Sequence, residues 1–198
     1  MSCWSLSAVR RFPECKTRLA ECLSTQRRMQ LVATMLGHVV SVLRRVPGVD
    51  QVAVVSPEPM SLPEHVISFD DPGGGLNQAL TAAALEALHR GADRLLIAHA
   101  DLPFLQPEEV MTLIEASKSS GLAIAPDRRG SGTNALCLTL PPTIRFQFGP
   151  ESFERHLAQA AARDISPAVV RLPGLAFDLD EPADLRSWSG YGERGTMR

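Results

Sequence analysis

Short apolar runs alternate with segments of helical periodicity along most of this chain. The apolar runs predict strands at residues 4–9, 51–56, 66–69, 95–98 and 122–125. Apolar residues recur at helical spacing in three segments between them, residues 32–43, 76–87 and 107–121. A chain that alternates strands with helices builds right-handed crossovers onto a parallel sheet. We therefore predict an α/β fold with a parallel, doubly wound sheet.

Size and composition limit the class of protein further. The chain has 198 residues, 44% of them hydrophobic, which suits one domain with a sizeable core. Its net charge of −2 gives no broad basic face, so we expect no nucleic-acid partner. No apolar run approaches the roughly 18 residues of a membrane span, and no signal-peptide pattern opens the chain. We expect a cytoplasmic single domain over residues 1–188, then a polar tail at 189–198 that is flexible or docked on a partner subunit.

Carboxylates follow two extended segments. Asp101 comes directly after the apolar run at residues 95–98, and Asp178 and Asp180 alternate with apolar neighbours, so both point to one side. Ligands of an open parallel sheet collect at the carboxyl ends of its strands, where three carboxylates would need a hard cation between them. The alternative is that Asp101 and Asp180 cap the helices that follow. A cap explains one aspartate at a time, so we prefer Mg²⁺ bound by all three.

A basic loop follows the first strand. It carries Arg10, Arg11, Lys16 and Arg18, and this density of cations suits a polyphosphate, although a solvated basic loop explains it equally well.

Three loops rich in small residues could also hold a ligand. Residues 70–77 contain three consecutive glycines ahead of a helix, residues 130–134 read Gly-Ser-Gly-Thr-Asn, and residues 148–153 precede another helix. Backbone amides exposed in such loops and at helix starts attract anions. Turns and ordinary helix caps give the same pattern, so each signal is weak alone.

Two histidines complete the candidates. His99 lies two residues before Asp101, so its ring should share that side of the chain and could contact a ligand. His156 falls in a helical segment, where we expect a surface or packing role.

Six motifs in this order resemble a known family. They are Lys16-Thr17-Arg18-Leu19, Gly75-Leu76-Asn77-Gln78-Ala79-Leu80, Ala100-Asp101-Leu102-Pro103, Gly132-Thr133-Asn134-Ala135-Leu136, Gly149-x-x-Ser152-Phe153 and Asp178-x-Asp180-x-Pro182-x-Asp184-Leu185. The chain is similar over nearly its whole length to 2-phospho-L-lactate guanylyltransferases and their bacterial relatives, which use phosphoenolpyruvate or 3-phosphoglycerate. These enzymes make a precursor of the deazaflavin coenzyme.

The resemblance implies an α/β/α sandwich of the nucleotide-diphospho-sugar-transferase type and a role for each motif. It implies GTP and a small phosphorylated three-carbon acid as ligands, and a homodimer is one assembly we consider. Mg²⁺ would bind to Asp101, Asp178 and Asp180, with Lys16 and Asp101 catalytic. The nucleotide would contact Arg10, Lys16, Arg18, Gly74, Gly75 and Asn77. The acid would contact His99, Thr133, Asn134, Gly149 and Ser152.

The chain departs from the family pattern at three positions. Arg10 stands where the family has lysine, Ser131 where it has glycine, and His99 where it has an apolar residue or proline. A buried imidazole without a partner costs about 1–3 kcal/mol, so His99 should favour an acid with an extra polar group. We therefore predict transfer of GMP from GTP, with 3-phosphoglycerate ahead of phosphoenolpyruvate and 2-phospholactate. The alternatives are a nucleotidyltransferase for a sugar phosphate or a molybdopterin-type acceptor, and a non-catalytic nucleotide-binding regulator.

Overall fold

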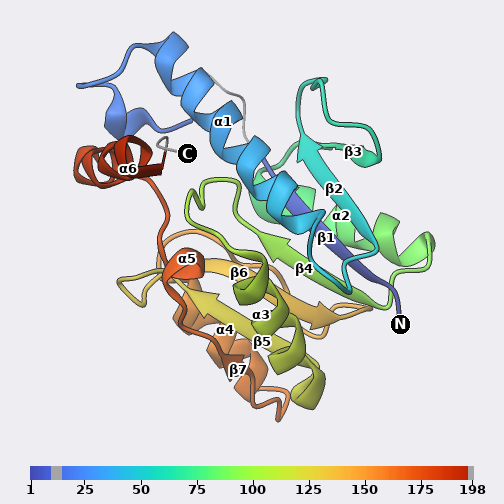
Figure 1. The fold of residues 1–198 in the computed structure, drawn as a ribbon. Helices are drawn as coiled ribbons and strands as arrows, with labels where there is room; N and C mark the ends of the chain where they lie inside the picture. Colours follow the sequence, from blue (N-terminus) through green and yellow to red (C-terminus); the bar gives the residue numbers. More distant parts are fainter. Residues whose placement is uncertain (10–14, 196–198) are drawn as a thin grey trace.

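One sheet of seven strands forms the centre of the molecule (Figure 1). The computed structural model describes residues 1–9 and 15–195, those from 189 on by their backbone alone. The strand order is β3-β2-β1-β4-β6-β5-β7. The strands are β1 (Cys3–Ala8), β2 (Gln51–Ser56), β3 (Val66–Asp70), β4 (Arg94–Ala98), β5 (Leu122–Pro126), β6 (Thr133–Thr139) and β7 (Ala168–Val169). The helices are α1 (Thr25–Leu43), α2 (Leu76–His89), α3 (Pro107–Ser120), α4 (Ser152–Ala161), α5 (Pro173–Ala176) and α6 (Pro182–Gly195), and η2 (Thr17–Leu19) is a 3₁₀ turn.

The sheet is mainly parallel, as the sequence predicts, but β6 runs antiparallel to both β4 and β5. Only a short loop joins β5 to β6, and a connection that short can only reverse the chain. The reversal places the first residues of β6 beside the carboxyl end of β4, where Ala98 pairs with Ala135.

Helices cover both faces of the sheet and make the three layers of an α/β/α sandwich (Figure 1). One core lies between the sheet and α1 and α3, and Val54 and Leu96 point into it. The other lies between the sheet and α2 and α4, and the neighbouring Val55 and Ile97 point into that one. Strands buried on both faces read as continuous apolar runs, which is why the sequence revealed them.

Caps decide where the helices begin. α1 begins earlier than the apolar period predicts, because the Ser24 hydroxyl accepts a hydrogen bond from the Arg27 amide at 3.4 Å. α3 begins with a capping box of Gln106 and Glu109, and ends at Gly121, whose φ of 76° is left-handed. The capping alternative for Asp101 is therefore wrong.

The chain's C-terminal part is helical in its backbone up to Gly195, including part of the segment predicted as a tail. Within residues 1–9 and 15–195, no helix combines the length and the apolar character that crossing a bilayer requires.

Candidate functional site

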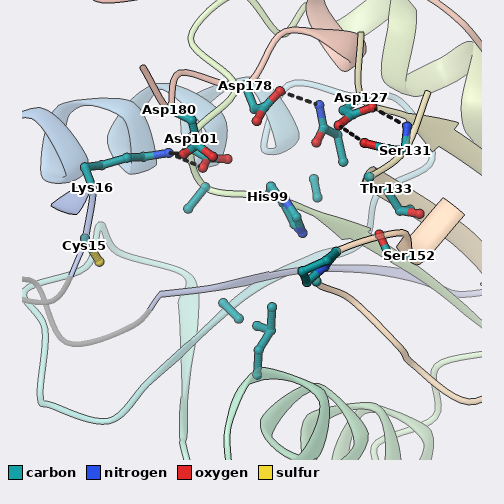
Figure 2. Close-up of a pocket in the computed structure, with 18 of the residues that line it drawn as sticks. Cys15, Lys16, His99, Asp101, Asp127, Ser131, Thr133, Ser152, Asp178 and Asp180 are labelled. Carbon is teal, nitrogen blue, oxygen red and sulfur yellow. Dashed lines mark hydrogen bonds and ion pairs between the residues drawn. The ribbon is translucent and has the colours of Figure 1, made fainter. Parts of the chain in front are cut away.

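A cavity of about 600 Å³ opens at the edge of the sheet where β1 and β4 end and β6 begins (Figure 2). Of the residues predicted from sequence, ten line it: Lys16, Arg18, His99, Asp101, Thr133, Asn134, Gly149, Ser152, Asp178 and Asp180. Gly74, Gly75 and Asn77 are not among the lining residues, and Arg10 lies outside the described residues. The topology thus brings most of the predicted site to one place.

Lys16 bridges two of the predicted metal ligands. Its backbone is left-handed, with a φ of 52°, directly before the turn η2, and its side chain is 7% exposed. Its Nζ lies 2.6 Å from Oδ1 of Asp180 and also donates to Oδ2 of Asp101. Arg18 adds a second cation 3.6 Å from the Asp180 carboxylate. The ammonium therefore neutralises two carboxylates, one from the middle of the chain and one from near its C-terminus.

The charges at this end of the cavity are strongly coupled. Burial alone would raise the pKa of Asp101, but the Lys16 ammonium and then His99 hold it below its usual value. Burial would lower the pKa of Lys16, but Asp101 and Asp180 raise it. For Asp178, burial and then the charges of Asp101 and Asp180 raise the pKa. A further cation would therefore stabilise the ionised form of Asp178 more than that of the other two carboxylates.

The donor set fits Mg²⁺ in its chemistry. Asp101, Asp178 and Asp180 offer the oxygen ligands that Mg²⁺ prefers, and the buried Oδ1 of Asp101 has no hydrogen-bond partner among the described residues. The same part of the chain holds no group of three or more His, Cys, Asp or Glu side chains already spaced to bind a metal. The Mg²⁺ assignment therefore stays a prediction, with Lys16 standing where a cation is needed.

Two residues that the sequence analysis did not single out hold the Asp178–Asp180 segment. Oδ2 of Asp184, at the start of α6, accepts hydrogen bonds from the amides of Asp180 and Glu181 at 2.9 and 2.8 Å, while Arg128 donates to its Oδ1. The Leu179 amide also donates to the carbonyl of Asp101 at 3.1 Å. An acidic residue in the first turn of a helix was the available signal for Asp184.

Asn134 also supports this segment. Its amide donates to the carbonyls of Leu175 and Ala176 at 3.0 and 3.1 Å, and reaches Oδ1 of Asp178 at 3.5 Å. The observed contacts therefore position the segment that carries Asp178, and contact with substrate stays a prediction.

The other end of the cavity is lined by the small polar residues Ser131, Thr133 and Ser152 and by the Asp127 carboxylate that binds Ser131. Figure 2 shows Thr133 and Ser152 at the end opposite Lys16, with His99 between the two ends. The first amides of α4 are already used, since Ser152 donates to the Gly149 carbonyl at 3.1 Å and Phe153 to the Ser131 carbonyl at 3.0 Å. The predicted anion site at this helix start must therefore rely on the hydroxyls of Thr133 and Ser152.

A carboxylate fixes the loop in front of Thr133. Oδ1 of Asp127 accepts from the Ser131 amide at 2.9 Å, and the Ser131 hydroxyl lies 3.4 Å from Oδ2. A Cβ at Gly132 would lie 2.8 Å from Asp127 Oδ2, so the loop needs glycine there. Ser131, which stands where the family has glycine, is oriented by Asp127.

Asn77 makes both of its side-chain hydrogen bonds to protein backbone. Its Oδ1 accepts from the Phe148 amide at 2.7 Å and its Nδ2 donates to the Phe148 carbonyl at 3.1 Å. The three glycines before it all have positive φ, and the Gln78 side chain lies over Gly74, where a Cβ would clash with it. Asn77 thus ties the start of α2 to the Phe148-Gly149 loop, and its role in binding nucleotide stays a prediction.

Comparison with known proteins identifies the family. Residues 5–195 match the model of the family described as guanylyl transferase CofC like. This chain belongs to that family. Phosphoenolpyruvate guanylyltransferase of Sphaerobacter thermophilus is 44% identical over 192 residues, covering 94% of this chain and 92% of the relative. The enzyme of the same name from Rubrobacter xylanophilus is 40% identical, covering 97% and 96%.

Solved structures show the same fold. A protein of Desulfovibrio desulfuricans G20, provisionally assigned as a nucleotide-diphospho-sugar transferase, superposes with a TM-score of 0.78 at 18% identity, covering 100% of this chain and 91% of that one. A 2-C-methyl-D-erythritol 4-phosphate cytidylyltransferase of Thermus thermophilus gives 0.58 at 16% identity, covering 98% and 100%. The predicted fold is confirmed. As a CofC-like protein, the chain is a guanylyltransferase, a nucleotidyltransferase that uses GTP.

The two candidate histidines of this guanylyltransferase have different surroundings. Nε2 of His99 is buried without a hydrogen-bond partner among the described residues, and its ring packs 5.2 Å from the Phe148 ring. His156, predicted to be a surface or packing residue, is fully buried in α4, and both of its ring nitrogens are hydrogen-bonded. Sequence alone offered no signal for those bonds.

Proposed function

We propose that this protein transfers GMP from GTP to the phosphate group of a three-carbon phospho-acid and releases pyrophosphate, in the synthesis of a deazaflavin coenzyme. The observation that carries the proposal is the contrast within one cavity between a cluster of charges at Lys16, Asp101, Asp178 and Asp180 and a second end with the hydroxyls of Thr133 and Ser152, where the Asp127 carboxylate is engaged by Ser131. The charge cluster suits a triphosphate with its cation, and the hydroxyl end suits a small acid.

The acceptor's own chemistry explains why the reaction needs no general base. The second pKa of a phosphate monoester is about 6, so the acceptor is mostly a dianion at neutral pH. One of its oxygens attacks the α-phosphorus of GTP and forms a new P–O bond. The bond from the α-phosphorus to the bridging oxygen then breaks, and its electron pair leaves with pyrophosphate. No proton has to move.

The difficulty is to bring one anion against another. Lys16 and Arg18, the two cations beside Asp180, would neutralise the triphosphate and hold it in line with the acceptor. Asp101, Asp178 and Asp180 would hold Mg²⁺, which would supply charge neutralisation at the α-phosphate. Asp184 and Asn134 would keep those carboxylates in place, since both bind the segment that carries them.

Phosphoenolpyruvate is the first acceptor to test, because the two relatives described above carry it in their names and are 44% and 40% identical. A separate observation favours 3-phosphoglycerate as a second candidate. The unpartnered Nε2 of His99 could bond to its hydroxyl, a group that phosphoenolpyruvate and 2-phospholactate lack at that carbon.

Pyrophosphate release measured with GTP, Mg²⁺ and each of the three acids tests the proposal. We expect release that requires an acid, and none with a sugar phosphate. Release with sugar phosphates alone would refute it, and GTP binding without release with any acceptor would support a non-catalytic regulator. His99→Pro should narrow any preference for 3-phosphoglycerate, and an unchanged ranking would refute the role of His99.

A further inference from the structure

A buried histidine lies directly behind a hydroxyl that lines the cavity. His156, on α4, is fully buried, and its Nδ1 lies 3.1 Å from Oγ1 of Thr133, the first residue of β6. Its Nε2 lies 3.1 Å from the backbone amide nitrogen of Gln147. The histidine therefore connects the loop before α4 to the start of β6.

The partner on Nε2 fixes the tautomer of the ring. A backbone N–H can only donate, so Nε2 must carry a lone pair and accept. In a neutral imidazole the other nitrogen then carries the proton, so Nδ1–H donates to Thr133. Burial, and then the charges of Arg155 and His99, lower the pKa of His156 to about 4, which keeps the ring neutral near pH 7.

The tautomer determines what Thr133 can offer the cavity. Its oxygen already accepts from His156, so its own O–H is directed elsewhere. Among the residues that the structure describes, this hydroxyl has no second hydrogen-bond partner, and Thr133 lines the cavity together with Ser152 and Gly149. Thr133 thus presents a proton, and an anionic oxygen is the natural acceptor for it.

The ring is held in place by packing as well. The Phe148 ring contacts it edge-on, with 5.2 Å between centroids and an angle of 71° between planes. Asn77 fixes the backbone of Phe148 on both sides of that residue. His156 therefore cannot turn over without moving the loop that carries Gly149.

We propose that His156 is a positioning residue, which holds the Thr133 hydroxyl as a hydrogen-bond donor toward an anionic oxygen of the phospho-acid. This inference rests on the proposed function, because it places that acid against Thr133. His156 acts through Thr133 and does not touch the acid.

Two amide substitutions separate this role from simple support of the loop. The Asn amide nitrogen can overlay Nδ1 and keep a donor to Thr133, whereas the Gln amide oxygen can overlay Nε2 and keep an acceptor for Gln147. We expect His156→Gln to raise KM for the acid at least tenfold, with KM for GTP within about threefold of wild type. His156→Asn should keep most of the affinity for the acid that His156→Gln loses. The reverse order, or equal losses in both variants, would overturn the proposal in favour of a structural role.

Nitrogen NMR of the wild-type chain gives a second readout that needs no variant. We expect the His156 ring to show a protonated Nδ1 and a bare Nε2 between about pH 6 and 8, and its Nδ1–H signal to shift when phosphoenolpyruvate or 3-phosphoglycerate is added. A protonated Nε2 would overturn the proposal. Failure of the proposed function looks different: no acid would be turned over, although the tautomer would still be as predicted. Failure of this inference alone would leave turnover intact and insensitive to His156→Gln.

Discussion

The two ends of the cavity differ in how their polar and charged groups are paired. At the Lys16 end, the carboxylates of Asp101 and Asp180 share one buried ammonium, and Oδ1 of Asp101 has no hydrogen-bond partner among the described residues. At the Thr133 end, the polar groups are already linked to one another, through His156, the loop of Gly149 and the Asp127 carboxylate that accepts from Ser131. The first end needs incoming cationic charge, whereas the second needs only an acceptor for the Thr133 hydroxyl. A polyphosphate with a cation therefore belongs at one end, and a small acid at the other.

The largest effect should come from removing charge at the first end. Asp101→Ala, Asp178→Ala and Asp180→Ala should each lower turnover about a thousandfold or more, because several kcal/mol of cation assistance disappear. Turnover at saturating Mg²⁺ and thermal unfolding should be measured together. Glu108→Ala, an exposed carboxylate on α3, is the matched control and should behave as wild type. Near-normal turnover in all three variants would refute the proposal that these carboxylates bind Mg²⁺.

His156, the buried histidine behind Thr133, should make the free energy of unfolding depend on pH. His156 has a pKa of about 4 in the folded chain and an ordinary value of 6.5, so below 6.5 the unfolded chain takes up a proton that the folded chain refuses. The stabilisation is complete above pH 6.5 and is lost as the pH falls toward 4, by about 3 kcal/mol at most.

Urea unfolding of wild type and His156→Asn between pH 4 and 8 measures this loss. The difference in unfolding free energy between the two proteins should shrink as the pH falls. A difference that stays constant with pH would mean that His156 is not held neutral.

Replacing Lys16 should weaken the binding of GTP more than the binding of the acid. Lys16→Ala should raise the KM for GTP about tenfold to a hundredfold, the size expected for one charge-assisted contact, and change the KM for the acid much less. The exposed Lys118, which pairs with Glu115 on α3, gives the control variant Lys118→Ala. A raised KM for the acid with an unchanged KM for GTP would mean that the Lys16 end binds the acid and the Thr133 end binds GTP.

The smallest effect should come from the residue that joins the two ends. Asn134→Ala leaves the carbonyls of Leu175 and Ala176 without their donor and loosens the Asp178 segment. We expect kcat to fall about tenfold, with little change in the KM for the acid. A rise in that KM with kcat unchanged would instead support the substrate contact that the sequence predicted.

Sequence patterns revealed the fold because buried strands and amphipathic helices leave apolar periods. They also located most of the cavity, since Asp101 and Thr133 stand in short motifs at strand ends and Asp178 stands in the motif before α6. They did not reveal that Asn77 and Asn134 bind backbone, because an amide bound to a carbonyl and one facing a ligand look alike in a sequence. They named Asp184 in a motif and gave His156 a surface or packing role, but did not reveal the hydrogen bonds that these side chains make to residues 4 and 23 positions away. The direction of β6 depended on pairing partners that the sequence does not name.

The most direct test of the two-ended cavity is the effect of Thr133→Val on each substrate. Thr133→Ser, which keeps the hydroxyl, is the matched control. With GTP saturating, the account predicts that kcat/KM for phosphoenolpyruvate or 3-phosphoglycerate falls at least tenfold in Thr133→Val and much less in Thr133→Ser. With the acid saturating, the KM for GTP should stay within about threefold of wild type. A loss confined to GTP, with the acid unaffected, would contradict the account.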